Sequence, residues 1–472
     1  MYLRKENFKF NIFLKQYIFL ISYIIVLLTL PGLVRFVFHK FNKTSFSYFT
    51  TYFHFVDVLI ISVFAYFFYK KRKITSFSKE NIFLIIYLMI ARFSLIYSDG
   101  NNHHKAYYDI VKLYLAASTF YFFQTKYFER NKKILVKVLV GVILPLALFS
   151  SVLAIAQFIN QGSIGISFLP EPVFGKNFLG SDIIYVSQNK INILKLFIKN
   201  ISDGQIIRSK ALFYHSNMLG GFLLISSFFT MVLIEKVKKS QKYLLSFFLL
   251  LQIIALITTF SRSAFIAYFL SSILWFFLMI KKRYKIKNVF LFFLFCSFFS
   301  ITLFSPLLIE RGLILFKKQS LEAKELNDSS SKVRYDLQNT SFKMIKKRPI
   351  RGIGFRNFII KRDNYTIDKN VERANVHNIY LLIFSEIGIL GVSSFLLLIF
   401  FILKDAYKYS LDSMGITLFS IFIAYLLIGL VDHYPIASQM GRYVIFLVLG
   451  YLNYQNKINK HLSFENTTYL CQ

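Results

Sequence analysis

Apolar stretches of about 20 residues, broken by short polar segments, follow one another along most of the chain. A helix of that length crosses the hydrocarbon core of a bilayer, so each stretch predicts a membrane-spanning helix. We expect about twelve such helices, at residues 17–38, 51–69, 81–97, 108–123, 134–159, 211–234, 243–260, 263–280, 288–308, 376–403, 414–431 and 440–454. The pattern therefore predicts an all-α fold, a polytopic helical bundle in a membrane.

Two polar segments are much longer than the others and divide the chain into regions. They lie at 161–210 and 309–375, and we expect both to be extracytoplasmic loops. The predicted regions are N-terminal transmembrane helices at 1–160, the first loop at 161–210, central transmembrane helices at 211–308, the large second loop at 309–375, and C-terminal transmembrane helices with a cytoplasmic tail at 376–472.

The second loop contains the segment "SSSKVRYDLQNTSFKMIKKRP", whose pattern predicts an amphipathic helix. Ser329 to Ser331 offer N-caps, and Pro349 is expected to end the helix. The rough apolar side consists of Val333, Leu337, Met344 and Ile345. The next residues, "RGIGFRN", contain Gly352 and Gly354, but no predicted strand precedes them. They therefore predict a turn rather than a dinucleotide-binding fingerprint.

One apolar run is too long for a single crossing, because it extends over 38 residues from Tyr243 to Ile280. Ser261, Arg262 and Ser263 interrupt it near its middle. An arginine at the centre of a bilayer costs roughly 2.5 kcal/mol or more. We therefore predict two helices with a tight reversal at Arg262, which places this arginine near the membrane surface.

The charge of the chain supports a membrane orientation rather than a nucleic-acid partner. The net charge is +34, and much of the Lys and Arg flanks the apolar stretches. With a cytoplasmic N-terminus, the positive-inside rule places five net positive short turns and the C-terminal tail inside. These turns are at 70–73, 124–133, 235–242, 281–287 and 404–408. Cys296 and Cys471 have no metal-ligand spacing, and we expect no disulfide between them.

Unusual polar residues share the predicted outer level of the membrane, some at helix ends and some in the loop at 309–375. They are Arg208, His215, Asn217, Arg262, Arg334, Arg351, Arg356, His377, Asn378, Asp432 and His433. Arginines supply fixed positive charge with bidentate geometry for phosphate oxygens. A neutral histidine can accept a proton from a hydroxyl group. The arrangement indicates a site at the membrane surface for an anionic, lipid-attached substrate.

Each residue also has a structural interpretation. Arg262 can be an interfacial anchor, and a histidine at a helix start is commonly a cap. Asp432 and His433 can simply end a helix, and Arg351 and Arg356 are expected to be solvated loop charges. Glu386 lies inside the span at 376–403, nine residues beyond His377, and is expected to have a structural pairing role.

Four segments between about 205 and 450 together resemble the O-antigen ligase and polymerase family. They are "RSKALFYHSNMLGGFL", "TTFSRSAFIAYFL", "SSSKVRYDLQNTSFKMIKKRPIRGIGFRNF" and "HNIYLLIFSEIGILGVSSFLLLI". The resemblance implies a GT-C-like fold and an inverting, metal-independent glycosyltransferase without a cofactor. It also implies a bacterial cytoplasmic-membrane protein that takes a glycan from an undecaprenyl diphosphate carrier on the extracytoplasmic side.

The resemblance assigns roles residue by residue. His377 would activate the acceptor hydroxyl, and Arg208 and Arg262 would hold the donor diphosphate. Asn217, Arg334 and Asn378 would be positioning groups. The chain departs from the family pattern at three positions, because Ala211 and Ser263 stand where glycine is common and Ser216 where proline is common. The resemblance does not choose between three acceptors, namely lipid A-core, a growing polysaccharide and protein.

Two other functions compete with a transferase. A flippase or other transporter of lipid-linked glycans is expected to show paired ionisable residues at mid-membrane or broken helices in two related halves. A structural membrane scaffold would leave the gathering of histidines and arginines unexplained. The one-sided placement of the polar residues favours the transferase.

Overall fold

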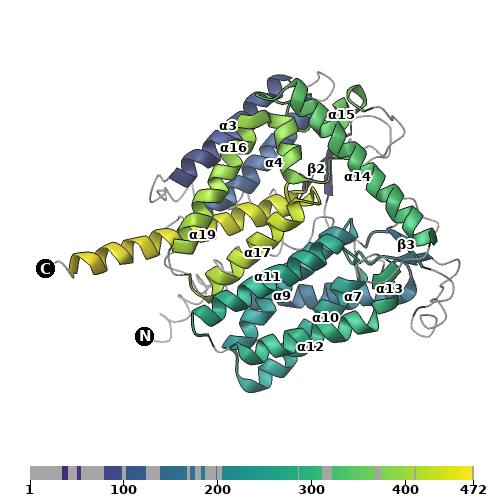
Figure 1. The fold of residues 1–472 in the computed structure, drawn as a ribbon, viewed down its shortest axis with the longest axis vertical. Helices are drawn as coiled ribbons and strands as arrows, with labels where there is room; N and C mark the ends of the chain where they lie inside the picture. The colour runs from purple at the N-terminus through teal and green to yellow at the C-terminus, as the bar shows by residue number, and fades with distance from the viewer. Residues whose placement is uncertain are drawn as a thin grey trace, which may run out of the picture.

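The computed structural model describes residues 35–40, 50–54, 79–97, 103–123, 139–166, 171–175, 182–186, 198, 205–284, 286–310, 321–366, 374–408 and 411–469. Helices dominate these segments (Figure 1). The longer ones are α3 (Lys79–Phe93), α4 (His103–Phe122), α7 (Leu144–Asn160), α9 (Ser216–Lys236), α10 (Lys239–Thr258), α11 (Arg262–Lys281), α12 (Lys287–Leu303), α14 (Leu321–Lys347), α16 (Ile379–Lys408), α17 (Ser413–Gly429) and α19 (Gln439–Tyr469).

Shorter elements connect these helices. They are the 3-10 turns η2 (Ser94–Tyr97) and η5 (Arg362–Asn364), the π-helical turn η4 (Leu139–Ile143), and the helices α13 (Ser305–Glu310), α15 (Phe358–Lys361) and α18 (Tyr434–Ala437). Two antiparallel strand pairs complete the described elements, β1 (Arg35–Lys40) with β2 (Thr50–His54) and β3 (Ile183–Tyr185) with β4 (Gln205–Ile207).

The prediction of a polytopic helical membrane protein is confirmed, although the count of twelve crossings is not. Every predicted span from 81–97 onward falls on a helix. Within the described residues, six helical segments are long and apolar enough to cross a membrane, namely Lys79–Tyr97, Leu139–Asn160, Ser216–Lys236, Lys239–Thr258, Arg262–Lys281 and Ile379–Lys408. α12 and α17 are apolar but shorter, with 17 residues each.

The prediction for the first two spans is wrong where the structure describes them. The end of the span at 17–38 belongs to β1, and the start of the span at 51–69 belongs to β2. An apolar run in a sequence does not by itself distinguish a strand from a buried helix. The other residues of these two spans lie outside the described segments.

The helices form two groups that meet at α17 (Figure 1). In one group α4 packs on α19 and α3 on α16, and in the other α9 packs on α7, α10 and α11. α9 is buried on nearly all sides, and Gly220 lets it approach α11, because a Cβ at this position would lie 3.0 Å from the Ala264 side chain. Small residues allow such close helix contacts in membrane proteins.

The predicted reversal at Arg262 is confirmed. α10 ends at Thr258 and α11 begins at Arg262. Phe260 adopts a positive φ of 46° between them, and the Ser261 hydroxyl accepts a hydrogen bond from the Ala264 amide at 3.4 Å. A serine at this position satisfies one of the free amides of a helix start.

α14 confirms the predicted helix in the second loop but begins earlier. Its first residue is Leu321, so Ser329 to Ser331 lie inside the helix and do not cap it. The preceding residues, "LEAKEL", are good helix formers, which explains why the helix extends toward the N-terminus. The helix ends at Lys347, before Pro349 as predicted, and it buries Leu337 and Met344.

α16 is broken in its middle, and the loop after α14 fills the break. Gly388 has φ 73° and ψ −174°, which is not helical. We call residues 349–357 the docked loop. The amides of Ile353 and Gly354 donate to the carbonyls of Ser385 and Glu386, each at 2.9 Å, and the Ile389 amide donates to the Pro349 carbonyl at 2.8 Å. The predicted turn is thus present, and it fastens α14 to α16.

Candidate functional site

Arg208 lies directly after β4, with its side chain only 6% exposed. Its Nε donates to the Thr259 carbonyl oxygen at 2.6 Å, and its Nη2 donates to the Asn217 Oδ1 at 2.6 Å. The guanidinium therefore joins the end of α10 to the start of α9. Burial lowers the pKa of Arg208, and the carboxylates of Asp182 and Asp432 oppose this change.

Asn217 continues the chain of polar contacts from Arg208 to the connection between α17 and α18. Its Nδ2 donates to the Asp432 Oδ2 at 2.6 Å. The other carboxylate oxygen, Oδ1, accepts the His433 amide at 2.7 Å and lies 3.7 Å from the His433 Nδ1. Asp432 is 4% exposed, so its charge is held inside the protein by these neighbours.

Asp182 holds a second group of polar residues beside Arg208. Its Oδ2 accepts the Ser216 hydroxyl at 2.8 Å and lies 3.7 Å from the Lys210 Nζ. Its Oδ1 lies 3.3 Å from the His215 Nε2. Burial raises the pKa of Asp182, but its interactions with His215, Arg208 and Lys210 outweigh this effect and hold the pKa well below its usual value.

His215 uses both ring nitrogens in these contacts. Its Nδ1 accepts the Asn217 amide at 3.0 Å as the N-cap of α9, while its Nε2 faces Asp182. A histidine with both nitrogens engaged has no lone pair left for an acceptor hydroxyl. The structure therefore supports the capping interpretation of His215.

His377 lies two residues before α16 and contacts His433. The two imidazole rings are edge to face, with centroids 5.1 Å apart and an interplanar angle of 83°. The His377 Nδ1 is buried and has no hydrogen-bond partner among the described residues. Burial, with a further contribution from His433, lowers the pKa of His377 to about 4, so the ring is neutral near pH 7.

Arg262 and Arg334 bring two further positive charges to the same place. Both side chains are half-buried, and Arg262 lies within electrostatic reach of Arg334 and Arg208. Arg334 also acts on His377. Neither Arg262 nor Arg334 forms an ion pair with a carboxylate of the described residues. Like charges that gather without a counterion favour binding of an anion.

The structure therefore brings most of the predicted site residues together and gives Asn378 a local role. The Asn378 Oδ1 accepts the amides of Tyr380 and Leu381, each at 2.9 Å, and its Nδ2 donates to the Leu430 carbonyl at 3.0 Å. Asn378 thus caps α16 and fixes the backbone beside His377.

A second polar cluster lies around the docked loop, on the side of α3, α4 and α19. Arg356 is ion-paired with Asp109, so the prediction of a solvated charge is wrong for this residue. Arg351 is exposed and lies over the Tyr97 ring at 4.5 Å. The Glu386 Oε1 accepts the Phe358 amide at 3.2 Å, which supports the structural role predicted for Glu386.

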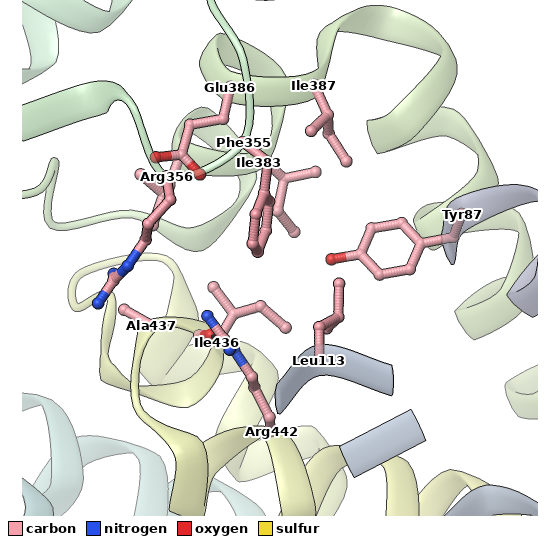
Figure 2. Close-up of a pocket in the computed structure, with 11 residues that line it drawn as sticks. Tyr87, Leu113, Phe355, Arg356, Ile383, Glu386, Ile387, Ile436, Ala437 and Arg442 are labelled. Atoms are coloured by element: carbon pink, nitrogen blue, oxygen red, sulfur yellow. Dashed lines mark hydrogen bonds between the residues drawn. The ribbon is translucent and has the colours of Figure 1, made fainter. Parts of the chain in front are cut away.

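Glu386 and Arg356 also line a pocket with Tyr87 and Arg442, and Figure 2 shows the Tyr87 hydroxyl directed into it. Arg442 is 3% exposed, and its Nε donates to the Ile436 carbonyl at 2.7 Å. Leucine and isoleucine side chains make up much of the remaining wall. This pocket belongs to the packing of the docked loop.

Asp182 and the His377–His433 contact are the parts of the site that sequence reasoning missed. Asp182 lies in a polar loop, where an acid is unremarkable, and the contact joins positions separated by more than 50 residues along the chain. The sequence did mark His433 as a candidate, because it follows an acid at a predicted helix end. The same pattern is equally typical of a helix end without any functional role.

The comparisons with known proteins agree with the resemblance in the sequence. A family model described as O-Antigen ligase matches residues 247–396. The match includes Arg262, Arg334 and His377 and stops before Asp432. No curated protein matches the chain.

Proposed function

Since residues 247–396 belong to the O-antigen ligase family, we propose that the whole chain transfers a glycan from a polyprenyl diphosphate, with undecaprenyl diphosphate as the carrier. The family and the apolar helices make it a bacterial membrane protein of polysaccharide biosynthesis. In the proposal it lies in the cytoplasmic membrane with both termini inside, and the transfer takes place on the outer face. The acceptor is lipid A-core, a growing polysaccharide or a protein.

The observation that carries this proposal is the position of His377 beside Arg334, which belongs to a group of three arginines. His377 is neutral, and its Nδ1 has no hydrogen-bond partner among the described residues, whereas both ring nitrogens of His215 are engaged. Arg334 acts directly on His377, and Arg262 and Arg208 lie within electrostatic reach of Arg334. A base for a hydroxyl thus lies beside a site for a diphosphate.

The reaction follows from this arrangement. The acceptor hydroxyl oxygen attacks the anomeric carbon from the face opposite the diphosphate, and its proton passes to His377. The bond between the anomeric carbon and the diphosphate oxygen breaks, and the oxygen keeps the electron pair. The arginines stabilise the charge that develops on the leaving diphosphate, so the proposal needs no metal ion. The anomeric configuration is inverted.

A transporter of lipid-linked glycans is the second candidate, because α16 is broken and charged residues lie near the break. Discontinuous helices are common at transporter binding sites. Here the backbone of the docked loop takes up the free carbonyls of Ser385 and Glu386, so the break is filled by the protein itself. This use of the break favours the transferase.

The test uses the full chain in vesicles with a polyprenyl-diphosphate glycan and candidate acceptors. We expect His377→Ala and Arg262→Ala each to lower transfer roughly a hundredfold or more at unchanged abundance. Arg351→Ala is the matched control, because this exposed arginine lies outside the site. The product should have the inverted configuration, and EDTA should not reduce the rate.

Wild-type activity in both variants would overturn the proposed mechanism. Movement of the lipid-linked glycan across the bilayer without transfer to any acceptor would support the transporter instead.

A further inference from the structure

Two buried ring nitrogens at the site are without hydrogen-bond partners among the described residues, the Nδ1 of His377 and the Nδ1 of His433. Buried polar atoms nearly always have a hydrogen-bond partner, so two unpaired nitrogens on rings that contact each other need an explanation. The two rings are 5.1 Å apart between centroids. Imidazoles joined by an N–H···N hydrogen bond have centroids roughly 5 Å apart. A rotation of one ring about its Cβ–Cγ bond, out of the edge-to-face arrangement, would allow such a hydrogen bond at this separation.

The chemistry of a histidine base explains why such a pairing is useful. A neutral imidazole has one N–H group and one lone pair. If His377 takes the acceptor proton on Nε2, its Nδ1 must carry the hydrogen, and this N–H group needs an acceptor to fix the tautomer and the ring orientation. In serine hydrolases a carboxylate has this role. Here the His433 ring contacts the His377 ring, and the Asp432 Oδ1 lies 3.7 Å from the His433 Nδ1.

Resting on the proposed function, we infer that His433 is a positioning residue for His377. Its Nε2 accepts the hydrogen bond from the His377 Nδ1, and its own Nδ1 donates to the Asp432 Oδ1, which is 3.7 Å away in the free protein. Catalytic hydrogen bonds in free enzymes are commonly long and tighten when substrate binds. The proton from the acceptor stays on His377, and the negative charge of Asp432 stabilises the imidazolium through His433.

The buried network behind His433 makes Asp432 a fixed partner. Its Oδ2 is held by Asn217, which is held in turn by Arg208. The charged and titratable groups that act on the two histidines from other elements are Arg334 on α14, Arg356 in the docked loop and His215 before α9, while Arg208 acts on Asp432. Asp432 is the anion among these neighbours, and its Oδ1 lies 3.7 Å from the His433 Nδ1.

The inference distinguishes His433→Gln from His433→Phe. A glutamine offers one acceptor oxygen and one donor nitrogen, so it can accept from His377 and donate to Asp432 without titrating. A phenylalanine keeps the size of the ring and removes both functions. We expect His433→Phe to lower kcat roughly ten- to hundredfold, and we expect His433→Gln to restore most of the loss at equal abundance.

The pH profile gives a measurement that a merely structural role would not change. Both histidines are buried, which lowers the pKa of each below the ordinary value. Both must be neutral in the wild type, so log kcat/KM should fall with a slope of one as the first ring is protonated and steepen toward two below the second, lower pKa. In His433→Gln only His377 titrates, and the slope should be one. This measurement still applies if the phenylalanine variant does not fold.

The outcomes separate this inference from the proposed function. Activity in His377→Ala would overturn both. An inactive His377→Ala with wild-type kcat and pH slope in His433→Phe would overturn the inference alone. A glutamine variant as impaired as the phenylalanine variant, with the slope unchanged at two, would also overturn it.

Discussion

Gly388→Ala tests the attachment of the docked loop to α16. Gly388 adopts φ 73° and ψ −174°, a conformation that residues with a Cβ rarely adopt. An added Cβ would lie 2.0 Å from the Ile350 carbonyl oxygen and 2.4 Å from its carbonyl carbon. Both contacts are with backbone, so no side-chain rotation relieves them. The loop must move away from the helix.

The cost follows from the contacts that would be lost. The backbone strain at this position is about 1–3 kcal/mol. The loop would also lose the backbone hydrogen bonds that join Ile353, Gly354 and Ile389 to their partners, each worth about 1 kcal/mol. The expected destabilisation is therefore about 4–6 kcal/mol. Transfer should fall as well, because the loop fixes α14, which carries Arg334, against α16.

The assay is unfolding of the detergent-solubilised protein, followed by melting temperature and by denaturant midpoint, with transfer measured in parallel. Gly141→Ala is the matched control, since it makes the same change in an apolar helix where nothing lies within 4 Å of the new Cβ. We expect this control to be neutral or slightly stabilising. A Gly388→Ala protein within about 0.5 kcal/mol of the wild type would refute the reasoning.

Three further predictions concern the site itself. Arg262→Lys keeps the charge but loses bidentate geometry, so the KM for the polyprenyl-diphosphate donor should rise about tenfold, and an unchanged KM would contradict a role in donor binding. Asp182→Asn should destabilise the protein by about 1–3 kcal/mol in melting experiments at pH 7, because the buried carboxylate holds Ser216, Lys210 and His215. The pKa of Asp182 is lowered on folding, so this carboxylate stabilises the folded protein above its unfolded pKa, and the stabilisation is lost as pH falls below about 4. If the wild type lost this stability at a higher pH, Asp182 would not be its source. The pKa of His377 is lowered to about 4, so kcat/KM should stay level as pH falls from neutrality to about 5, whereas an acid limb near 6.5, the ordinary pKa of histidine, would show that the base is exposed or is another residue.

The features that the sequence predicted well are those set by the thickness of a bilayer and by local chain chemistry. The reversal at Arg262 follows from the length of one apolar run, and the end of α14 follows from Pro349. The start of α14 was not predicted, because three serines are only weak helix breakers when strong helix formers precede them. The strands β1 and β2 were missed, because apolar runs suit either secondary structure.

The break in α16 depends on contacts that no local pattern contains. A single glycine in an apolar helix pattern is ordinarily tolerated, so Gly388 gives no sign of a positive φ. The break exists because the docked loop supplies partners for the freed backbone groups. The link from Arg208 through Asn217 to Asp432 is similar, since the last two residues are 215 positions apart. The sequence predicted that these side chains lie at one level of the membrane, but not which atoms meet.

The structure also distinguishes the three arginines that the site brings together. Arg208 is almost wholly buried and already donates to Thr259 and Asn217, so much of its donor capacity is used to hold α9, α10 and the Asp432 connection in place. Arg262 and Arg334 are half-buried and have no ion pair among the described residues. Desolvated like charges repel one another, and a bound diphosphate would relieve that repulsion. Donor binding should therefore depend chiefly on Arg262 and Arg334, while Arg208 supports the carboxylate of Asp432 behind the two histidines. In the proposed mechanism, the site thus divides its positive charge between the leaving group and the network that orients the base.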